Sequence, residues 1–147
     1  MKAMLRTRIN DAQQNKDQGN IQVKHKNWNK ALELYESGSA ALGVVTAASG
    51  LMSESLRQRV SKLNIALNNN SALCYLKLDR YPEAEAHAEL VLKEEKSNYK
   101  ALCRRASARI QQKQHAAARK DLEKAKRLYP AKPEAKRMLN QLAATTT

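Results

Sequence analysis

The sequence predicts an all-helical protein assembled from three copies of a two-helix unit, and three observations support this prediction. The 147 residues include only four glycines and three prolines, and no segment alternates apolar and polar residues as a half-buried β-strand does. Apolar residues recur instead at helical spacing. A pattern of small and ring side chains also repeats with a period of 34 residues, which is typical of stacked helical hairpins.

The repeated pattern consists of a small residue, a ring side chain nine positions later and an alanine three positions after the ring. The second and third copies lie 34 residues apart, whereas the first precedes the second by 53 residues, which leaves 19 residues as an insertion. Counting outward, one domain, 1–147, contains repeats at about 12–45, 65–98 and 99–132 and an insertion at about 46–64. The three copies of the pattern are Gly19, Trp28 and Ala31, then Ala72, Tyr81 and Ala84, and finally Ala106, His115 and Ala118.

Each repeat is expected to form two antiparallel helices that cross where the side chains are small, because small side chains let two helices approach closely. Pro82 suits the first turn of a helix and Pro130 suits a helix end, since proline lacks an amide hydrogen. The segment 38–53, rich in Ala, Gly, Ser and Thr, is expected to be partly helical extension and partly loop. The seven expected helices span about 5–25, 28–43, 54–78, 82–95, 98–112, 115–128 and 132–144.

The last expected helix, 132–144, has an apolar side and a basic side. Ala135 and Leu142 fall on the apolar side, and Lys136 and Arg137 on the other. Because a repeat unit cannot bury its apolar face alone, we expect this helix to cap the stack. The closing residues, Ala-Ala-Thr-Thr-Thr, are expected to be disordered.

Composition excludes several classes of protein. No run of about 18 apolar residues exists that would span a membrane, and the first residues lack the apolar stretch of a secretory signal. Cys74 and Cys103 are too few for a disulfide framework, which favours reduced thiols and a cytoplasmic or nuclear location. Both cysteines fall on first helices of neighbouring repeats, where small buried thiols are expected.

The sequence offers little support for catalysis. His25, His87 and His115 stand apart from one another, with no His or Cys spacing typical of a metal site. There is neither a Gly-x-Ser-x-Gly motif nor a glycine-rich phosphate loop. We therefore expect a non-catalytic chain with no cofactor and no bound metal.

The 34-residue helix-turn-helix period resembles the tetratricopeptide repeat (TPR), and the resemblance covers almost the whole chain. It implies a right-handed superhelical stack of three repeats and a capping helix. Lys-Asp-Gln-Gly-Asn at 16–20, Asn-Ser-Ala-Leu-Cys-Tyr-Leu-Lys-Leu at 70–78 and Asn-Tyr-Lys-Ala-Leu-Cys-Arg-Arg-Ala at 98–106 resemble the chaperone-binding domains of large immunophilins. The immunophilin could be of the cyclophilin type, which Asn27-Trp28 favours, or of the FK506-binding type. Either would place a prolyl isomerase domain outside this chain.

In that family, five side chains called the carboxylate clamp hold the C-terminal Glu-Glu-Val-Asp of ninety- and seventy-kilodalton heat-shock chaperones. Two pairs are spaced i and i+4, so each pair lies on one helix face. First helices of successive repeats line one concave side, so all five are expected to converge on a cationic, amide-lined groove. The resemblance implies that the clamp residues are Lys16, Asn20, Asn70, Lys100 and Arg104.

Charge supplies the alternative interpretation. The formal net charge is +13, and the segment 96–147 holds 14 basic and 3 acidic residues. Such a surface suits RNA or a scaffolding role. However, basic residues such as Arg105, Arg109 and Arg119 are scattered around two helices, with no interleaved aromatics for base stacking. We therefore favour electrostatic steering of an acidic chaperone tail, and expect neither nucleic acid nor membrane as a partner.

Overall fold

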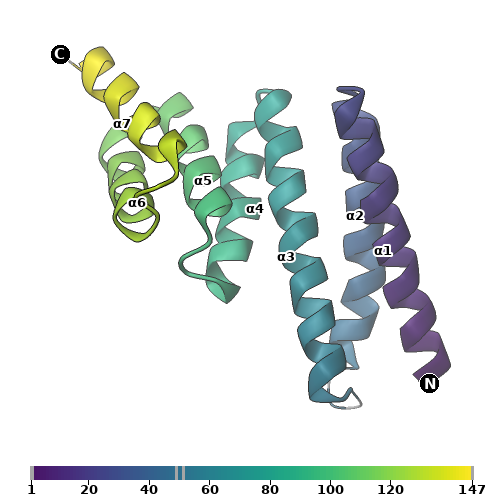
Figure 1. Cartoon of the computed structure of the whole chain (residues 1–147). Helices are drawn as coiled ribbons and strands as arrows, with labels where there is room; N and C mark the ends of the chain where they lie inside the picture. The colour runs from purple at the N-terminus through teal and green to yellow at the C-terminus, as the bar shows by residue number, and fades with distance from the viewer. Residues whose placement is uncertain (1, 49, 51, 147) are drawn as a thin grey trace.

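Seven α-helices follow one another along an elongated stack in chain order, and each packs against the next (Figure 1). The computed structural model describes residues 2–48, 50 and 52–146. Within these ranges every predicted helix is present and no β-strand occurs. The helices are α1 (Lys2–Lys24), α2 (Trp28–Ala47), α3 (Glu54–Lys77), α4 (Tyr81–Glu94), α5 (Tyr99–Gln111), α6 (His115–Leu128) and α7 (Pro133–Thr146).

The small residues of the repeated pattern lie buried within the helix pairs, as the sequence predicts. A Cβ atom added at Gly19 of α1 would overlap the ring of Tyr35 on α2, so this crossing requires glycine. The ring residues of the pattern are the first residues of α2, α4 and α6. The five alanines of the pattern are completely buried: Ala31, Ala72, Ala84, Ala106 and Ala118.

Each helix pair closes through the same turn, which the sequence analysis did not predict. One non-glycine residue in each turn has a left-handed φ: 60° at Lys26, 57° at Asp79 and 63° at Lys113. The next amide then donates to a carbonyl five residues earlier, which satisfies a helix-end carbonyl. These bonds run from Asn27 to Gln22, from Arg80 to Tyr75 and from Gln114 to Arg109, at 2.9, 2.9 and 2.8 Å.

Residues 46–64, expected as an insertion, mainly lengthen two helices. Helix α2 continues to Ala47, and α3 already begins at Glu54, where the Ser53 hydroxyl accepts a hydrogen bond from the Leu56 amide at 3.2 Å. Val60 and Leu63 in this added part of α3 are buried. The expected mixture of helix and connection is thus present in 38–53, although positions 49 and 51 lie outside the described residues.

The prediction of a disordered end is wrong for residues 143–146. Helix α7 continues to Thr146, and only position 147 lies outside the described residues. Leu142, 2% exposed, is buried one turn before the end, so packing continues to this point. Ala135 is also buried, while Lys136 and Arg137 are exposed, as expected of a cap.

Two groups of buried apolar side chains run through the stack. The first gathers mainly from α1, α2 and α3, and includes Tyr35, Leu42 and Leu67. The second gathers from α4 to α7, and includes Leu102 and Leu122. Each helix pair therefore buries its apolar face against its neighbour, and the first helices of the pairs can share one side of the stack.

Candidate functional site

Two of the five predicted clamp residues are in direct contact. Asn20 on α1 and Asn70 on α3 are 50 residues apart in sequence, and the Asn70 Nδ2 group donates to Asn20 Oδ1 at 3.0 Å. The Tyr35 hydroxyl donates to the same oxygen at 2.6 Å. Because the Asn20 oxygen accepts both bonds, the orientation of the Asn20 side-chain amide is fixed, and its NH₂ group points away from Tyr35 and Asn70.

Tyr35 was not predicted, yet it positions Asn20. Its side chain is buried on α2, and burial raises the pKa of its hydroxyl to about 12. Gly19, beside Asn20, leaves the room that this ring fills. Tyr35 lies one helical turn after Ala31, a residue of the repeated pattern, and that i, i+4 spacing is the sequence signal that would have identified it.

Arg104 on α5 connects the second and third helix pairs. Its guanidinium donates to the backbone carbonyl of Asn69 on α3 at 2.6 Å, next to Asn70. Burial lowers the pKa of Arg104, but guanidinium groups stay protonated in proteins. The Asn98 side-chain oxygen also accepts a hydrogen bond from the side-chain NH₂ group of Asn69 at 3.1 Å. The same oxygen caps α5 by accepting from the backbone amide of Ala101 at 2.9 Å. These bonds hold α5 in a defined position against α3.

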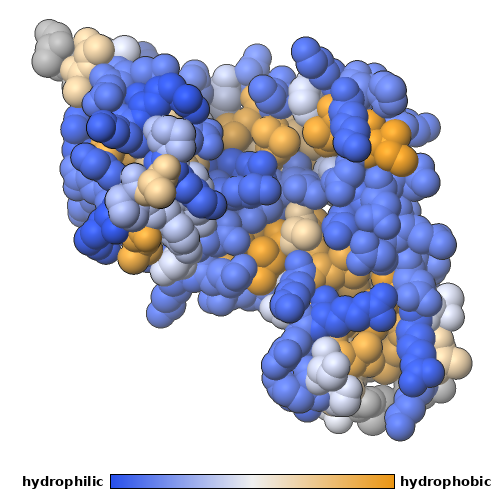
Figure 2. All heavy atoms as spheres, viewed as in Figure 1, coloured by the Kyte–Doolittle hydropathy of each residue, from blue (hydrophilic) through white to orange (hydrophobic). Residues whose placement is uncertain are grey.

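Lys100 and Arg104 both line a cavity of about 400 Å³, whose walls come mainly from α3 and α5. Lys100 is exposed, whereas Arg104 is half-buried. Apolar Leu73 and Leu76 also line this cavity, and Glu134 at the start of α7 closes one side. Viewed from the side of Figure 2, hydrophilic side chains cover most of the molecule and apolar ones surface in its hollowed middle.

Lys16 lines a different cavity, also of about 400 Å³, between α1 and the first half of α3. Arg59 and Lys62 accompany it there, and both come from the segment that lengthens α3. The structure therefore brings Asn20 together with Asn70 and Lys100 together with Arg104, and it places Lys16 in a neighbouring basic recess. All five predicted residues lie on the first helices α1, α3 and α5.

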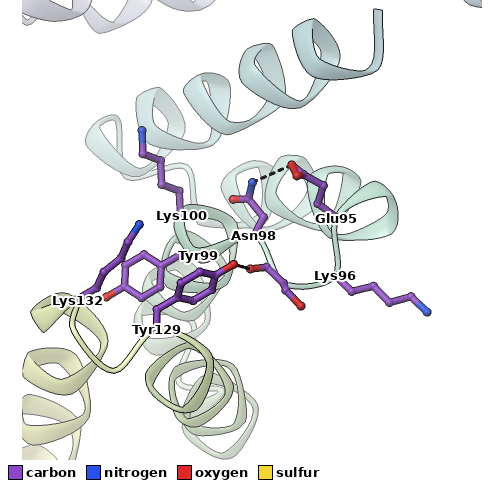
Figure 3. A pocket seen from close by; sticks show the side chains of 8 residues that line it. Glu95, Lys96, Asn98, Tyr99, Lys100, Tyr129 and Lys132 are labelled. Carbon is purple, nitrogen blue, oxygen red and sulfur yellow. Dashed lines mark hydrogen bonds between the residues drawn. The ribbon is translucent and has the colours of Figure 1, made fainter. Parts of the chain in front are cut away.

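A third cavity, of about 500 Å³, adjoins Lys100 where α4, α5 and α6 end or begin (Figure 3). Tyr99 and Tyr129 meet edge to face with ring centroids 5.4 Å apart, and Lys132 Nζ lies 4.8 Å and 5.4 Å from their centroids. In Figure 3 the Lys100 side chain points away from this tyrosine pair. The cluster fixes the first turn of α7, because the Ala135 amide donates to the Tyr99 hydroxyl at 2.9 Å.

Two arginines considered for nucleic-acid binding are engaged inside the protein. Arg105 pairs with Asp121 at 2.7 Å, and Arg109 pairs with the same carboxylate at 3.0 Å and with Glu85 at 2.8 Å. Asp121 is only 5% exposed. These ion pairs hold α4, α5 and α6 together, so the two arginines contribute little to an outer basic surface.

The remaining candidate groups are structural. Cys74 and Cys103 are free and buried, as predicted, and burial raises the pKa of each thiol to about 11. Among the described residues, no group of His, Cys, Asp and Glu side chains is arranged to hold a metal ion. No described helix is long and apolar enough to cross a membrane.

Helix hairpins stacked in this order, with small residues at their crossings, define a tetratricopeptide-repeat domain. More particularly, the domain is like those of FK506-binding immunophilins. The sequence is 34% identical over 140 residues to the peptidyl-prolyl cis-trans isomerase FKBP42 of Arabidopsis thaliana, and 31% identical over 124 residues to FKBP4 of Rattus norvegicus. These matches cover 92% and 84% of this chain but only 37% and 26% of the two relatives. No family model matches the sequence.

Solved structures support the same assignment. The C-terminal TPR domain of a Plasmodium falciparum FK506-binding protein superposes with a TM-score of 0.84 and 27% identity, covering 95% of this chain and 90% of that one. The second TPR domain of human RPAP3, in complex with an HSP70 peptide, gives 0.72 and 26%, covering 95% and 98%. The second TPR domain of Spaghetti, bound to an HSP90 peptide, gives 0.67 and 28%, covering 85% and 96%. The TPR domain accounts for all seven helices of the described residues, and no catalytic domain lies within those residues.

Proposed function

We propose that this domain binds the free C-terminal acidic tail of a heat-shock chaperone, ending in Glu-Glu-Val-Asp, through a carboxylate clamp. The observation that carries the proposal is the bonded pair Asn20 and Asn70, which joins α1 to α3 beside an arginine anchored on the next helix. Two similar TPR domains support the choice of ligand. One was solved with the HSP70 peptide SGPTIEEVD and the other with the HSP90 peptide SRMEEVD.

The proposed chemistry divides the five side chains between two tasks. Lys16, Asn20 and Asn70 receive the terminal carboxylate and the last peptide group. Lys100 and Arg104 receive acidic side chains that precede the end of the tail. Hydrogen bonds between charged groups contribute about 1.5–3 kcal/mol each when well aligned. A micromolar Kd corresponds to about −8 kcal/mol, and the entropy lost on binding must be offset as well, so most of the five side chains have to contribute.

Preorganisation favours this role over nonspecific attraction. Asn20 is held by two hydrogen bonds, and Arg104 is held by a backbone carbonyl before any ligand arrives. Less side-chain entropy is therefore lost when the tail binds. The net charge of +13 adds long-range attraction for an acidic tail.

The proposed context is a cytoplasmic co-chaperone, with the nucleus as a second location. The buried reduced thiols and the similarity to FK506-binding immunophilins support it. In this context the chain would be the TPR part of a larger peptidyl-prolyl isomerase, and it would bring that enzyme to a chaperone. The clamp itself is a binding device, which needs no cofactor.

Calorimetry with the peptide SRMEEVD tests the proposal. The free-acid peptide is expected to bind one to one with a Kd near the micromolar range, and amidating its C-terminus is expected to weaken binding at least tenfold. Lys100→Ala should weaken binding about tenfold, since Lys100 is exposed and its loss removes one charged contact. Lys126→Ala, an exposed site on α6 with the same change in charge, is the matched control. Equal affinity for the acid and the amide would refute carboxylate recognition.

A further inference from the structure

Glu134 lies between two neighbouring cavities and, with Ser107 and Gln111, lines both of them. One is the cavity of Lys100 and Arg104, and the other, of about 390 Å³, lies between α5 and α7 and is lined by Ile110, Met138 and other side chains. Glu134 is the only carboxylate among the residues that line either cavity. It therefore places a negative charge where the cavity of Lys100 and Arg104 adjoins a second cavity, which Arg137 also lines.

The position of Glu134 is set by its surroundings. It lies in the first turn of α7, where a negative side chain is favoured by the helix dipole. The next residue, Ala135, is buried and donates its amide to the Tyr99 hydroxyl at 2.9 Å, which fixes the start of α7 against α5. The nearby Lys132 ammonium lies over the tyrosine rings (Figure 3), and none of the ion pairs within the described part of the chain involves Glu134. The exposed carboxylate is accessible to a ligand, although its charge also acts on Arg104 across the cavity that both residues line.

The distance between the asparagine pair and α7 indicates which residue of a bound tail would reach Glu134. If the tail ends at the asparagine pair between α1 and α3, then α7 lies two first-helix positions further along the stack. Packed helices are roughly 8–10 Å apart, so the path is about 16–20 Å. An extended peptide advances about 3.3 Å per residue, and the path therefore takes about five residues.

We propose that Glu134 makes this site prefer acidic tails that carry an arginine or lysine about five residues before their end. This inference rests on the proposed function, since it needs the tail to end at the clamp. The acidic residues nearest the end meet Lys100 and Arg104, and the basic residue then meets the carboxylate. SRMEEVD has an arginine five residues before its terminal aspartate, whereas SGPTIEEVD has no basic residue. The domain should accordingly prefer the first kind of tail.

Fluorescence anisotropy with two free-acid peptides, SRMEEVD and SAMEEVD, tests the inference. The wild-type domain is expected to bind the arginine peptide about threefold more tightly, as befits a solvent-exposed ion pair. Glu134→Gln should abolish this preference while the affinity for SAMEEVD stays within twofold. Glu123→Gln, on the exposed side of α6 and with the same change in charge, should retain the preference.

The outcomes separate this inference from the proposed function. Wild-type protein that binds both peptides equally, or a preference that persists in Glu134→Gln, would overturn the role of Glu134 and leave the clamp intact. Failure of the wild-type protein to bind either peptide would overturn the clamp, and the inference with it. A preference lost in Glu134→Gln and kept in Glu123→Gln would establish both.

Discussion

Replacing Tyr35 with phenylalanine removes one oxygen atom from the centre of the proposed site. The ring stays, so the space beside Gly19 remains filled, and only the 2.6 Å hydrogen bond to Asn20 is lost. The Asn20 oxygen still accepts from Asn70 at 3.0 Å and is not left unpaired. The expected loss of stability is therefore about 1 kcal/mol, the value of an ordinary hydrogen bond, or a fall of about 2–4 °C in Tm.

The effect on peptide binding follows from the freedom that Asn20 regains. Ordering one side chain at an interface costs about 0.5–1.5 kcal/mol, so the substitution should weaken binding of SRMEEVD about 3- to 10-fold. Urea unfolding measures the first effect and calorimetry the second.

The chain offers a close control in Tyr75→Phe. Tyr75 is also buried, its pKa is likewise raised to about 12 by burial, and its hydroxyl donates to Glu36 at 2.8 Å. Its partner is not a clamp residue, so this variant should lose stability and keep its affinity for the peptide. Unchanged binding by Tyr35→Phe, or equal weakening in both variants, would refute the reasoning that Tyr35 orients the clamp.

Four further substitutions test the packing, the turns and the ion pairs by denaturant unfolding. Gly19→Ala should destabilise the protein by about 1–3 kcal/mol through overpacking, whereas Gly43→Ala, in α2 with open space around it, should stabilise it by about 0.5–1 kcal/mol. Lys113→Gly should raise the free energy of unfolding by about 1 kcal/mol, because glycine adopts the left-handed φ at this position without strain. An unchanged free energy of unfolding would contradict this account of the turn. Burial raises the pKa of Glu85, but the hydrogen bonds from Arg109 and Gln112 and the nearby arginine charges together outweigh burial, and the net pKa is lowered. Its contribution is thus fully present above the unfolded pKa of about 4.3 and is lost as pH falls through the folded value. Glu85→Gln should flatten this acid-sensitive part of a stability profile.

Local pattern was enough to predict the helices and their crossings. Ala72 and Ala84 must be small for two helices to touch, and that requirement is met by residue type at a fixed spacing. The start of each second helix could also be predicted from nearby residues, since Trp28 and Tyr81 are the first residues of α2 and α4. The repeat period therefore appeared directly in the order of the residues.

The conformation of the turns and of the end of the chain was harder to predict from the sequence. Lys26 and Lys113 adopt a conformation that favours glycine, and a lysine gives no sign of it, whereas Asp79 is of a type that tolerates this conformation. The closing threonines look like a flexible tail by composition, yet helix α7 continues because Leu142 packs inside the stack. In both cases tertiary packing outweighs local preference.

The sequence alone determined the helical repeat, because the repeat depends on residue type at regular spacing along the chain. The five residues proposed as a clamp followed from the resemblance to chaperone-binding TPR domains. Only the tertiary structure decided that Tyr35 holds Asn20, that Arg105 and Arg109 pair internally, and that Glu134 faces the groove of Lys100. These relations join side chains on different helices, and hydrogen bonds and ion pairs form only when packing has brought their donor and acceptor atoms to within about 3 Å of each other.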